Sequence, residues 1–121
     1  MDTQSLFSLA GRTALVTGGS RGIGKMIATG FVAQGAKVYI SSRKADVCAA
    51  VAEELGPNCI AVPQDISTVD GCKALAATMA EHESSVDILV NNAGAAWGES
   101  FETFPEAGWD KVMDLNVKSI F

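Results

Sequence analysis

The stretch TGGSRGIG, residues Thr17 to Gly24, decides the fold of this 121-residue sequence. It follows an apolar run at 14–16 and opens a segment in which apolar side chains recur as on one face of a helix. Its glycines have the spacing G-x-x-x-G-x-G, and such a turn presents backbone N–H groups to a diphosphate at a helix N-terminus. We expect Gly18 to permit the turn, Gly22 to permit close approach of the ligand, and Gly24 to permit close packing of helix on strand.

Four short apolar runs predict four strands. They lie at residues 14–16, 38–40, 60–62 and 88–90. The runs do not alternate with polar residues, which is typical of parallel strands covered on both faces by crossover helices. Segments with helical spacing separate the runs. The predicted fold class is therefore α/β, a Rossmann-type doubly wound parallel sheet with the element order βαβαβαβα and the strand order 3-2-1-4.

Four apolar stripes predict the helices. They consist of Ile23, Ile27 and Phe31; of Val47, Ala50, Val51 and Leu55; of Val69, Cys72, Ala76 and Met79; and of Trp109, Val112, Met113 and Ile120. We expect Gly35 and Gly56 to end the first two helices, Ser67 to cap the third, and Pro105 to lie in the first turn of the fourth. No stop signal follows residues 118–121, so we expect one domain, residues 1–121, that is incomplete at its C-terminus.

The same turn overlaps a second phosphate-binding pattern. Residues 19–26, GSRGIGKM, match G-x-x-x-x-G-K-[ST] except at the last position, where Met26 has no hydroxyl to bind Mg²⁺. No acidic metal ligand follows the run at 88–90 either, so the sequence disfavours a nucleotidase. Lys25 is then a helix-surface lysine. His82 stands alone between two glutamates on an expected solvated helix end, and no metal site is predicted.

Composition narrows the kind of ligand. The formal net charge is −5, yet six of the nine basic residues lie within the first 44 positions, where Asp2 is the single acid. Positive charge gathered in one segment suits a discrete anionic ligand better than a nucleic acid. Cys48, Cys59 and Cys72 are odd in number and form no C-x-x-C pair, which indicates reduced thiols and a cytoplasmic protein. No apolar run approaches the roughly 18 residues of a membrane span.

The end of the second strand predicts the cofactor. At this place in such a sheet an acid binds the ribose 2′-hydroxyl of NAD, whereas a basic residue accommodates the 2′-phosphate of NADP. Here the residues are Ser41, Ser42, Arg43 and Lys44, without a carboxylate. Arg43, beside Ser42, can form a forked contact with phosphate, and Arg21 can approach from the glycine turn. NADP(H) is the predicted cofactor, although an exposed arginine at a helix start remains the alternative.

Further motifs follow the other strands. Asp65 and Ile66 follow the third strand, NNAG at 91–94 follows the fourth, and DLNVKS at 114–119 lies in the last helix. With TGGSRGIG, these motifs resemble the short-chain dehydrogenase/reductase family over nearly the whole chain. Within that family, SLAGR, GAAWGES and GWDKVMDLNV are most similar to 3-oxoacyl-type reductases, including the rhamnolipid-pathway kind.

The resemblance implies an oxidoreductase that reduces a ketone or oxidises a secondary alcohol and assembles as a homo-tetramer or homo-dimer when complete. It implies that Asp65 binds the adenine amino group with Ile66 alongside, and that Asn91 ties neighbouring strands together. It also implies that Asn92, Ala93 and Gly94 line the ribose and nicotinamide. The full predicted cofactor-binding set is Gly18, Ser20, Arg21, Gly22, Ile23, Gly24, Ser42, Arg43, Asp65, Ile66, Asn92, Ala93 and Gly94.

Asn116 is the predicted catalytic residue, because it matches the asparagine that holds a relay water through its helix backbone in the family. A buried amide without partners is costly, which supports a task for it, while a satisfied structural asparagine remains the alternative. The family's catalytic serine, tyrosine and lysine find no match, since the single tyrosine, Tyr39, lies inside the second strand and precedes Arg43 by four positions. We expect the chain alone to be inactive. A non-catalytic nucleotide-binding module is the rival interpretation.

Overall fold

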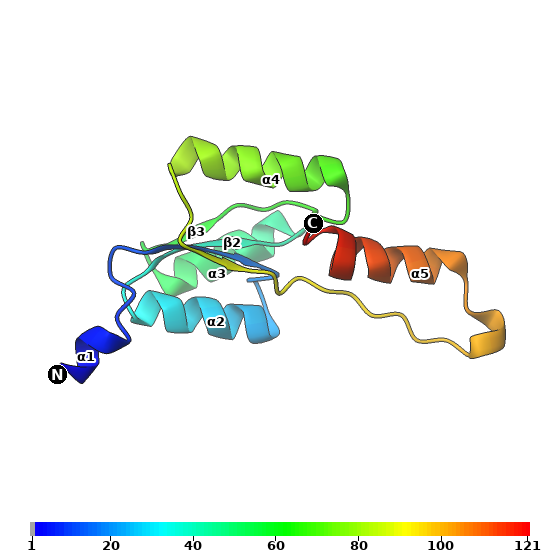
Figure 1. Ribbon diagram of the computed structural model, residues 1–121, viewed down its shortest axis with the longest axis horizontal. Helices are drawn as coiled ribbons and strands as arrows, with labels where there is room; N and C mark the ends of the chain where they lie inside the picture. The colour runs from blue at the N-terminus through cyan, green and yellow to red at the C-terminus, as the bar shows by residue number, and fades with distance from the viewer. Residues whose placement is uncertain (1) are drawn as a thin grey trace.

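The computed structural model describes residues 2–121 as one sheet with helices on both sides (Figure 1). The first half contains α1 (Thr3–Leu6), β1 (Thr13–Thr17), α2 (Gly22–Ala33), β2 (Lys37–Ser41), α3 (Ala45–Leu55) and β3 (Cys59–Ala61). The second half contains α4 (Val69–His82), β4 (Ile88–Val90), a 3-10 turn (Phe101–Thr103), α5 (Glu106–Met113) and a π-helical turn (Asp114–Lys118).

The four strands are parallel and lie in the order β3-β2-β1-β4. Leu15 of β1 lies opposite Tyr39 of β2 on one side and Leu89 of β4 on the other. The predicted α/β fold and its strand order 3-2-1-4 are therefore confirmed. β3 begins one residue before the predicted run, at Cys59.

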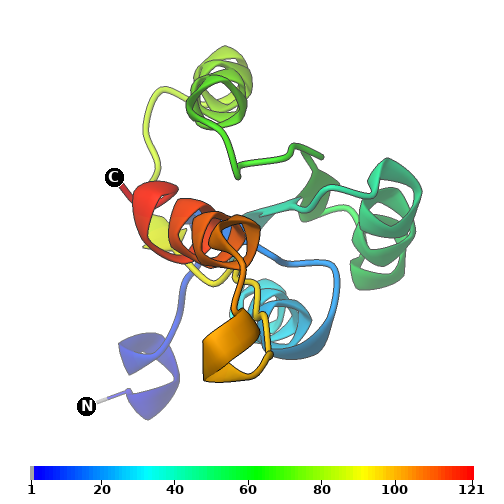
Figure 2. The same ribbon diagram turned by 90° about the vertical axis from the view of Figure 1, so that its right-hand side faces the viewer.

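Each strand contributes to two cores because its side chains alternate between the faces of the sheet. On one face, Val16 and Ile40 pack with Cys48 of α3 and with α2. On the other, Leu15 and Tyr39 pack with residues of α4. The view along the sheet shows α4 on one side and α2 and α3 on the other (Figure 2). Coverage of both faces explains why the strands are apolar without alternation.

Several details of the predicted helices are wrong. Thr68, not Ser67, caps α4, since its hydroxyl accepts a hydrogen bond from the Gly71 N–H at 3.0 Å. The predicted stripes of α2 and α3 pack against the core at Ile27, Phe31, Val51 and Leu55. Their first residues do not, because Ile23 and Val47 line the cleft at the carboxyl edge of the sheet and are 65% and 38% exposed. In contrast, Gly35 and Gly56 have positive φ values where α2 and α3 end, as predicted.

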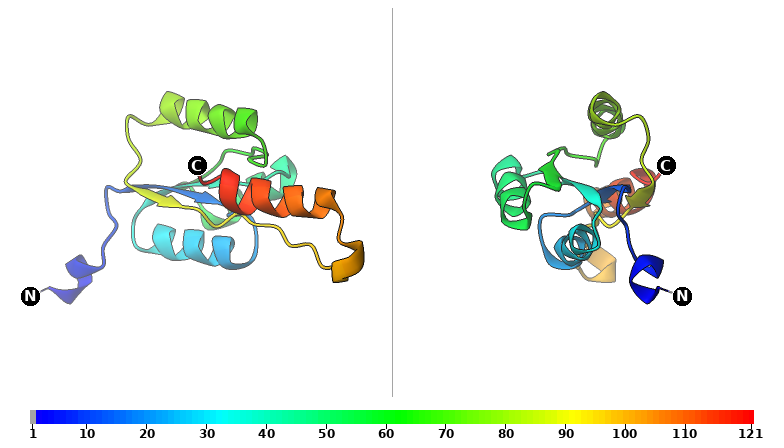
Figure 3. Two further views of the ribbon diagram at one scale, coloured as in Figure 1. Left: turned by 45° about the vertical axis from the view of Figure 1, so that its right-hand side comes forward. Right: turned by 90° about the vertical axis from the view of Figure 1, so that its left-hand side faces the viewer.

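The fourth predicted helix is not continuous. Pro105 is the N-cap of α5 rather than a residue of its first turn, and α5 gives way to the π-helical turn after Met113. Trp109 and Ile120, predicted to be buried, are 60% and 55% exposed. Figure 3 shows the reason: α5 extends beyond the sheet, so part of its surface meets no other element.

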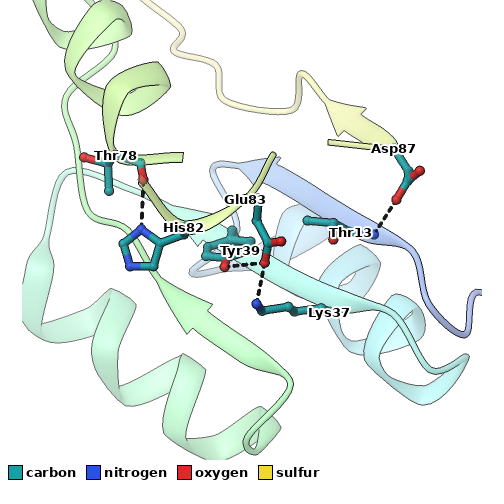
Figure 4. Close-up of polar contacts among 7 residues, drawn as sticks. All are labelled: Thr13, Lys37, Tyr39, Thr78, His82, Glu83 and Asp87. Carbon is teal, nitrogen blue, oxygen red and sulfur yellow. Dashed lines mark hydrogen bonds and ion pairs between the residues drawn. The ribbon is translucent and has the colours of Figure 1, made fainter. Parts of the chain in front are cut away.

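Polar contacts join strands and the end of α4 at the amino edge of the sheet (Figure 4). Tyr39, buried as predicted, donates its phenolic O–H to Glu83 at 2.7 Å, and the same carboxylate pairs with Lys37. His82 is exposed at the end of α4, as expected, and its ring lies edge-on against the Tyr39 ring with centroids 5.9 Å apart. Asp87 accepts a hydrogen bond from the Thr13 N–H at 2.8 Å and ties the starts of β4 and β1 together.

The Glu83 contacts predict a pH dependence of stability. Lys37 and then Tyr39 hold the pKa of Glu83 below its ordinary value of 4.5, so this stabilisation is complete above that value and disappears as the pH falls through the lowered pKa. Glu83 raises the pKa of Lys37 above 10.5, so the pair persists up to alkaline pH. We expect Glu83→Gln to lower the melting temperature at pH 7, and we expect its difference from wild type to shrink as the pH falls from 4.5 through the lowered pKa of Glu83. Thermal unfolding across this pH range measures the difference in melting temperature, and Glu81→Gln, at an exposed position, is the control. Equal effects of the two variants would contradict the prediction.

Candidate functional site

A cleft of about 900 Å³ lies along the carboxyl ends of the strands. It is lined by the glycine turn, the ends of β2 and β3, the NNAG segment and one side of α5 and the π-helical turn. Ligands of open α/β sheets bind at this edge, where the chain turns away from the strands to opposite faces.

The three glycines of the turn differ in what disfavours a side chain. Gly18 and Gly22 have φ values of +65° and +55°, which other residues rarely adopt. A Cβ at Gly24 would lie 2.1 Å from the carbonyl oxygen of Gly18, so α2 can start here only without a side chain. Gly19, to which the sequence assigned no role, also needs its lack of a side chain, because a Cβ there would lie 2.7 Å from Ile40.

The N-terminus of α2 is open toward the cleft. Its N-cap, Arg21, makes no side-chain capping hydrogen bond, and a Cβ placed on Gly22 would meet no atom within 4 Å. The first N–H groups of a helix have no partner within the helix and carry a partial positive charge. The turn therefore offers donors and space for an anionic group such as a diphosphate.

The tie between β1 and the NNAG segment is made by Asn92 and not by Asn91. Asn92 Nδ2 donates to the carbonyl oxygens of Thr17 and Gly18 at 3.0 and 3.2 Å, whereas Asn91 is exposed. Thr17 Oγ1 accepts the backbone N–H groups of Asn92 and Ala93 at 3.1 and 3.0 Å. Sequence reasoning missed Thr17, although a hydroxyl at the end of an otherwise apolar strand was a usable signal.

Three basic side chains, Arg21, Arg43 and Lys44, are available at the β2 end of the cleft. Arg21 and Arg43 both line it, and within residues 2–121 the ion pairs of the structure involve other cations. One of those is Lys25, which pairs with Glu54 at 2.7 Å outside the cleft, as expected of a helix-surface lysine. Lys44 follows Arg43 in the lining. This end of the cleft therefore fits an anionic substituent in addition to the diphosphate.

Asp65 lies across the same end of the cleft. Its carboxylate accepts the Ser67 N–H at 3.0 Å. Hydrogen bonds from Ser67, with Arg43 nearby, hold the pKa of Asp65 below its ordinary value. Asp65 is therefore an ionised acceptor at neutral pH, with Ile66 as an apolar surface beside it.

Asn116 joins the π-helical turn to the segment after β4. Its Oδ1 accepts the Ala95 N–H at 2.7 Å, and its Nδ2 donates to the Ala95 carbonyl at 2.9 Å. Gly94 lies against it, because a Cβ on that glycine would be 3.3 Å from Asn116 Oδ1. Both polar atoms of the side chain thus contribute to positioning the loop, and Asn116 is not among the residues that line the cleft.

The structure brings the predicted residues together. Every residue of the predicted cofactor-binding set lines the cleft except Gly24, which acts beneath it through packing. Further lining residues were missed: Ser41, Lys44, Val47, Gln64, Ser67, Thr68, Ala95, Ala96, Lys111, Asp114 and Leu115. Most neighbour predicted positions in sequence. Lys111 had no such signal, because only the packing of α5 places it there. Asp114 and Leu115 precede Asn116, which was predicted for catalysis and not for cofactor binding.

The aromatic residues between β4 and α5, which are Trp97, Phe101 and Phe104, are not among the residues that line the cleft. Trp97 packs against Gly108 and lies under the Lys111 ammonium group, 5.5 Å from its ring centroid. Phe101 is almost fully exposed, and Phe104 is 39% exposed. Across the described part of the chain, none of the helices combines the length and the apolar character that crossing a bilayer requires.

Comparison with known proteins agrees with this geometry. The sequence profile described as short chain dehydrogenase matches residues 12–121. The chain is 53% identical over 117 residues to a rhamnolipids biosynthesis 3-oxoacyl-[acyl-carrier-protein] reductase of Pseudomonas aeruginosa, covering 95% of this chain and 46% of the relative. It is 40% identical to nodulation protein G of a Rhizobium strain, covering 96% and 47%. The chain therefore spans about half the length of the curated relatives it matches.

Solved structures give the same relation. The Pseudomonas aeruginosa RhlG/NADP active-site complex superposes with a TM-score of 0.91 at 53% identity, over 95% of this chain and 46% of that one. L-sorbose reductase from Gluconobacter frateurii, complexed with NADPH and L-sorbose, superposes with a TM-score of 0.89 at 30% identity, over 94% and 45%. The parallel sheet, the glycine turn and the profile match over residues 12–121 together show that this chain belongs to the short-chain dehydrogenase family.

Proposed function

We propose that this chain is the cofactor-binding half of an NADP(H)-dependent oxidoreductase that reduces a ketone or oxidises a secondary alcohol. The observation that carries the proposal is the cleft, which combines an uncapped helix N-terminus with cations that form no ion pair among the described residues, Arg21 and Arg43 among them. A bound NADPH would supply the hydride in reduction, and a bound NADP+ would accept it in oxidation. The residues of this chain bind its diphosphate and its ribose phosphate and orient it along the sheet edge.

A 3-oxoacyl thioester is the ketone that we propose as substrate. The support is the 53% identity to a relative named as a 3-oxoacyl-[acyl-carrier-protein] reductase. We also propose that the complete protein is a cytoplasmic homo-oligomer, as the reduced thiols and the family resemblance suggest.

Proton donation requires residues outside this chain in our proposal. Tyr39 does not fit the role, because it has no exposed surface and its O–H is bound to Glu83 on the α4 side of the sheet. We expect the 121-residue chain to bind NADPH and to oxidise none of it with acetoacetyl-CoA. A polypeptide extended by a serine and a Y-x-x-x-K motif is expected to oxidise NADPH, followed at 340 nm. An extended protein that binds NADPH and turns over no carbonyl compound would favour the non-catalytic module.

Arg43→Ala tests the choice of cofactor. A charge-assisted hydrogen bond to phosphate contributes about 1.5 to 3 kcal/mol, so the NADPH dissociation constant should rise on the order of 10- to 100-fold. The dissociation constant of NADH, which lacks the 2′-phosphate, should barely change. Calorimetric titration of both nucleotides measures it, with Arg12→Ala, an arginine outside the cleft lining, as control. Equal losses for NADPH and NADH would contradict the assignment.

Asn116→Ala tests the role of the π-helical turn. The substitution leaves the N–H and C=O of Ala95 without their side-chain partner, and the two lost hydrogen bonds should lower the free energy of unfolding by about 1 to 2 kcal/mol. Asn91→Ala, at an exposed position, should change it by less than about 0.5 kcal/mol. Urea unfolding compares them.

In the complete enzyme, a part in the proton relay predicts that Asn116→Ala lowers kcat on the order of 100-fold while KM for NADPH changes little. A loss of stability with an unchanged kcat would leave Asn116 as a structural asparagine.

A further inference from the structure

Ser41 has a buried hydroxyl at the cleft, and the predicted cofactor-binding set does not include this residue. It ends β2, is 2% exposed and lines the cleft. Its Oγ is buried and has no hydrogen-bond partner within residues 2–121. A buried hydroxyl without a partner is destabilising, and few persist in folded proteins without a reason.

The neighbouring strand shows how such a hydroxyl is otherwise used. Thr17 lies opposite Ser41 in the register of β1 and β2. Its Oγ1 contacts the carbonyl of Val90 and the N–H groups of Asn92 and Ala93. The Thr17 hydroxyl therefore serves the protein itself, whereas the Ser41 hydroxyl at the same level of the sheet serves no other described residue.

The position of Ser41 indicates which part of a ligand it meets. Strand alternation puts Ser41 on the same face as Tyr39, the face on which Ile66 is buried. Ser41 also precedes Arg43 by two residues. Ser41 therefore lies at the end of the cleft that Arg43, Asp65 and Ile66 line. The NNAG segment and the π-helical turn line the other end.

We propose that Ser41 is a further cofactor-binding residue whose hydroxyl makes a hydrogen bond to the adenosine half of NADP(H). The inference rests on the proposed function, since it needs the dinucleotide to occupy this cleft. This role explains why Ser41, which is about as buried as Ile40, has a polar side chain. Its hydroxyl gains a hydrogen-bond partner only when the ligand is bound.

Ser41→Ala separates this role from a structural one. In the free protein the substitution removes an unpartnered hydroxyl, so the melting temperature should stay the same or rise. The dissociation constants of NADPH and of adenosine 2′,5′-bisphosphate should each rise about 5- to 10-fold, the loss of one neutral hydrogen bond. The bisphosphate carries the adenosine half without the nicotinamide. Ser84→Ala, at an exposed position before β4, is the control and should change neither quantity.

The outcomes distinguish the inference from the proposed function. A wild-type protein that binds neither ligand in calorimetry overturns both. A wild-type protein that binds both ligands, with Ser41→Ala binding them equally well, overturns only the role of Ser41. A lower melting temperature of the free Ser41→Ala variant also overturns it, because the hydroxyl would then have its partner within the protein.

Discussion

The cleft depends on the contact of α2 with a single peptide group, the carbonyl of Gly18. Gly24 approaches that oxygen so closely that a Cβ would lie 2.1 Å from it. Asn92 approaches it from the other side and donates its side-chain N–H at 3.2 Å. One carbonyl therefore fixes the distances between β1, the start of α2 and the segment after β4. The start of α2 is thereby held at the cleft, which Gly18 and Gly22 line.

The two edges of the sheet use their polar groups differently. At the amino edge, Glu83 is shared by Lys37 and Tyr39, and Asp87 joins β1 to β4. At the carboxyl edge, the hydroxyls of Ser41 and Ser42 have no partner among the described residues. Polar contacts at the first edge stabilise the fold, so the second edge can keep donors unpaired for a ligand at some cost in stability.

The π-helical turn extends this arrangement to the far end of the cleft. Asn116 holds both polar groups of the Ala95 backbone, and Leu115 packs partly against the core beneath α4. The segment after β4 and the last helical elements are thereby positioned as a unit. Interruptions of this kind occur frequently at functional sites, because they turn side chains away from the regular helical face.

Much of this protein could be predicted from local sequence alone. The four apolar runs, the glycine turn and the basic end of β2 are short segments whose physics is local: burial on both faces, positive φ, and the absence of a Cβ. The tertiary structure decided what depends on residues distant in sequence. It assigned the strand tie to Asn92 instead of Asn91, satisfied the Asn116 amide through Ala95, and placed Lys111 and Asp114 in the cleft lining. It also left the Ser41 hydroxyl without a partner, since hydrogen bonding across a sheet edge depends on which strands and turns meet there, and no single segment of sequence contains that information.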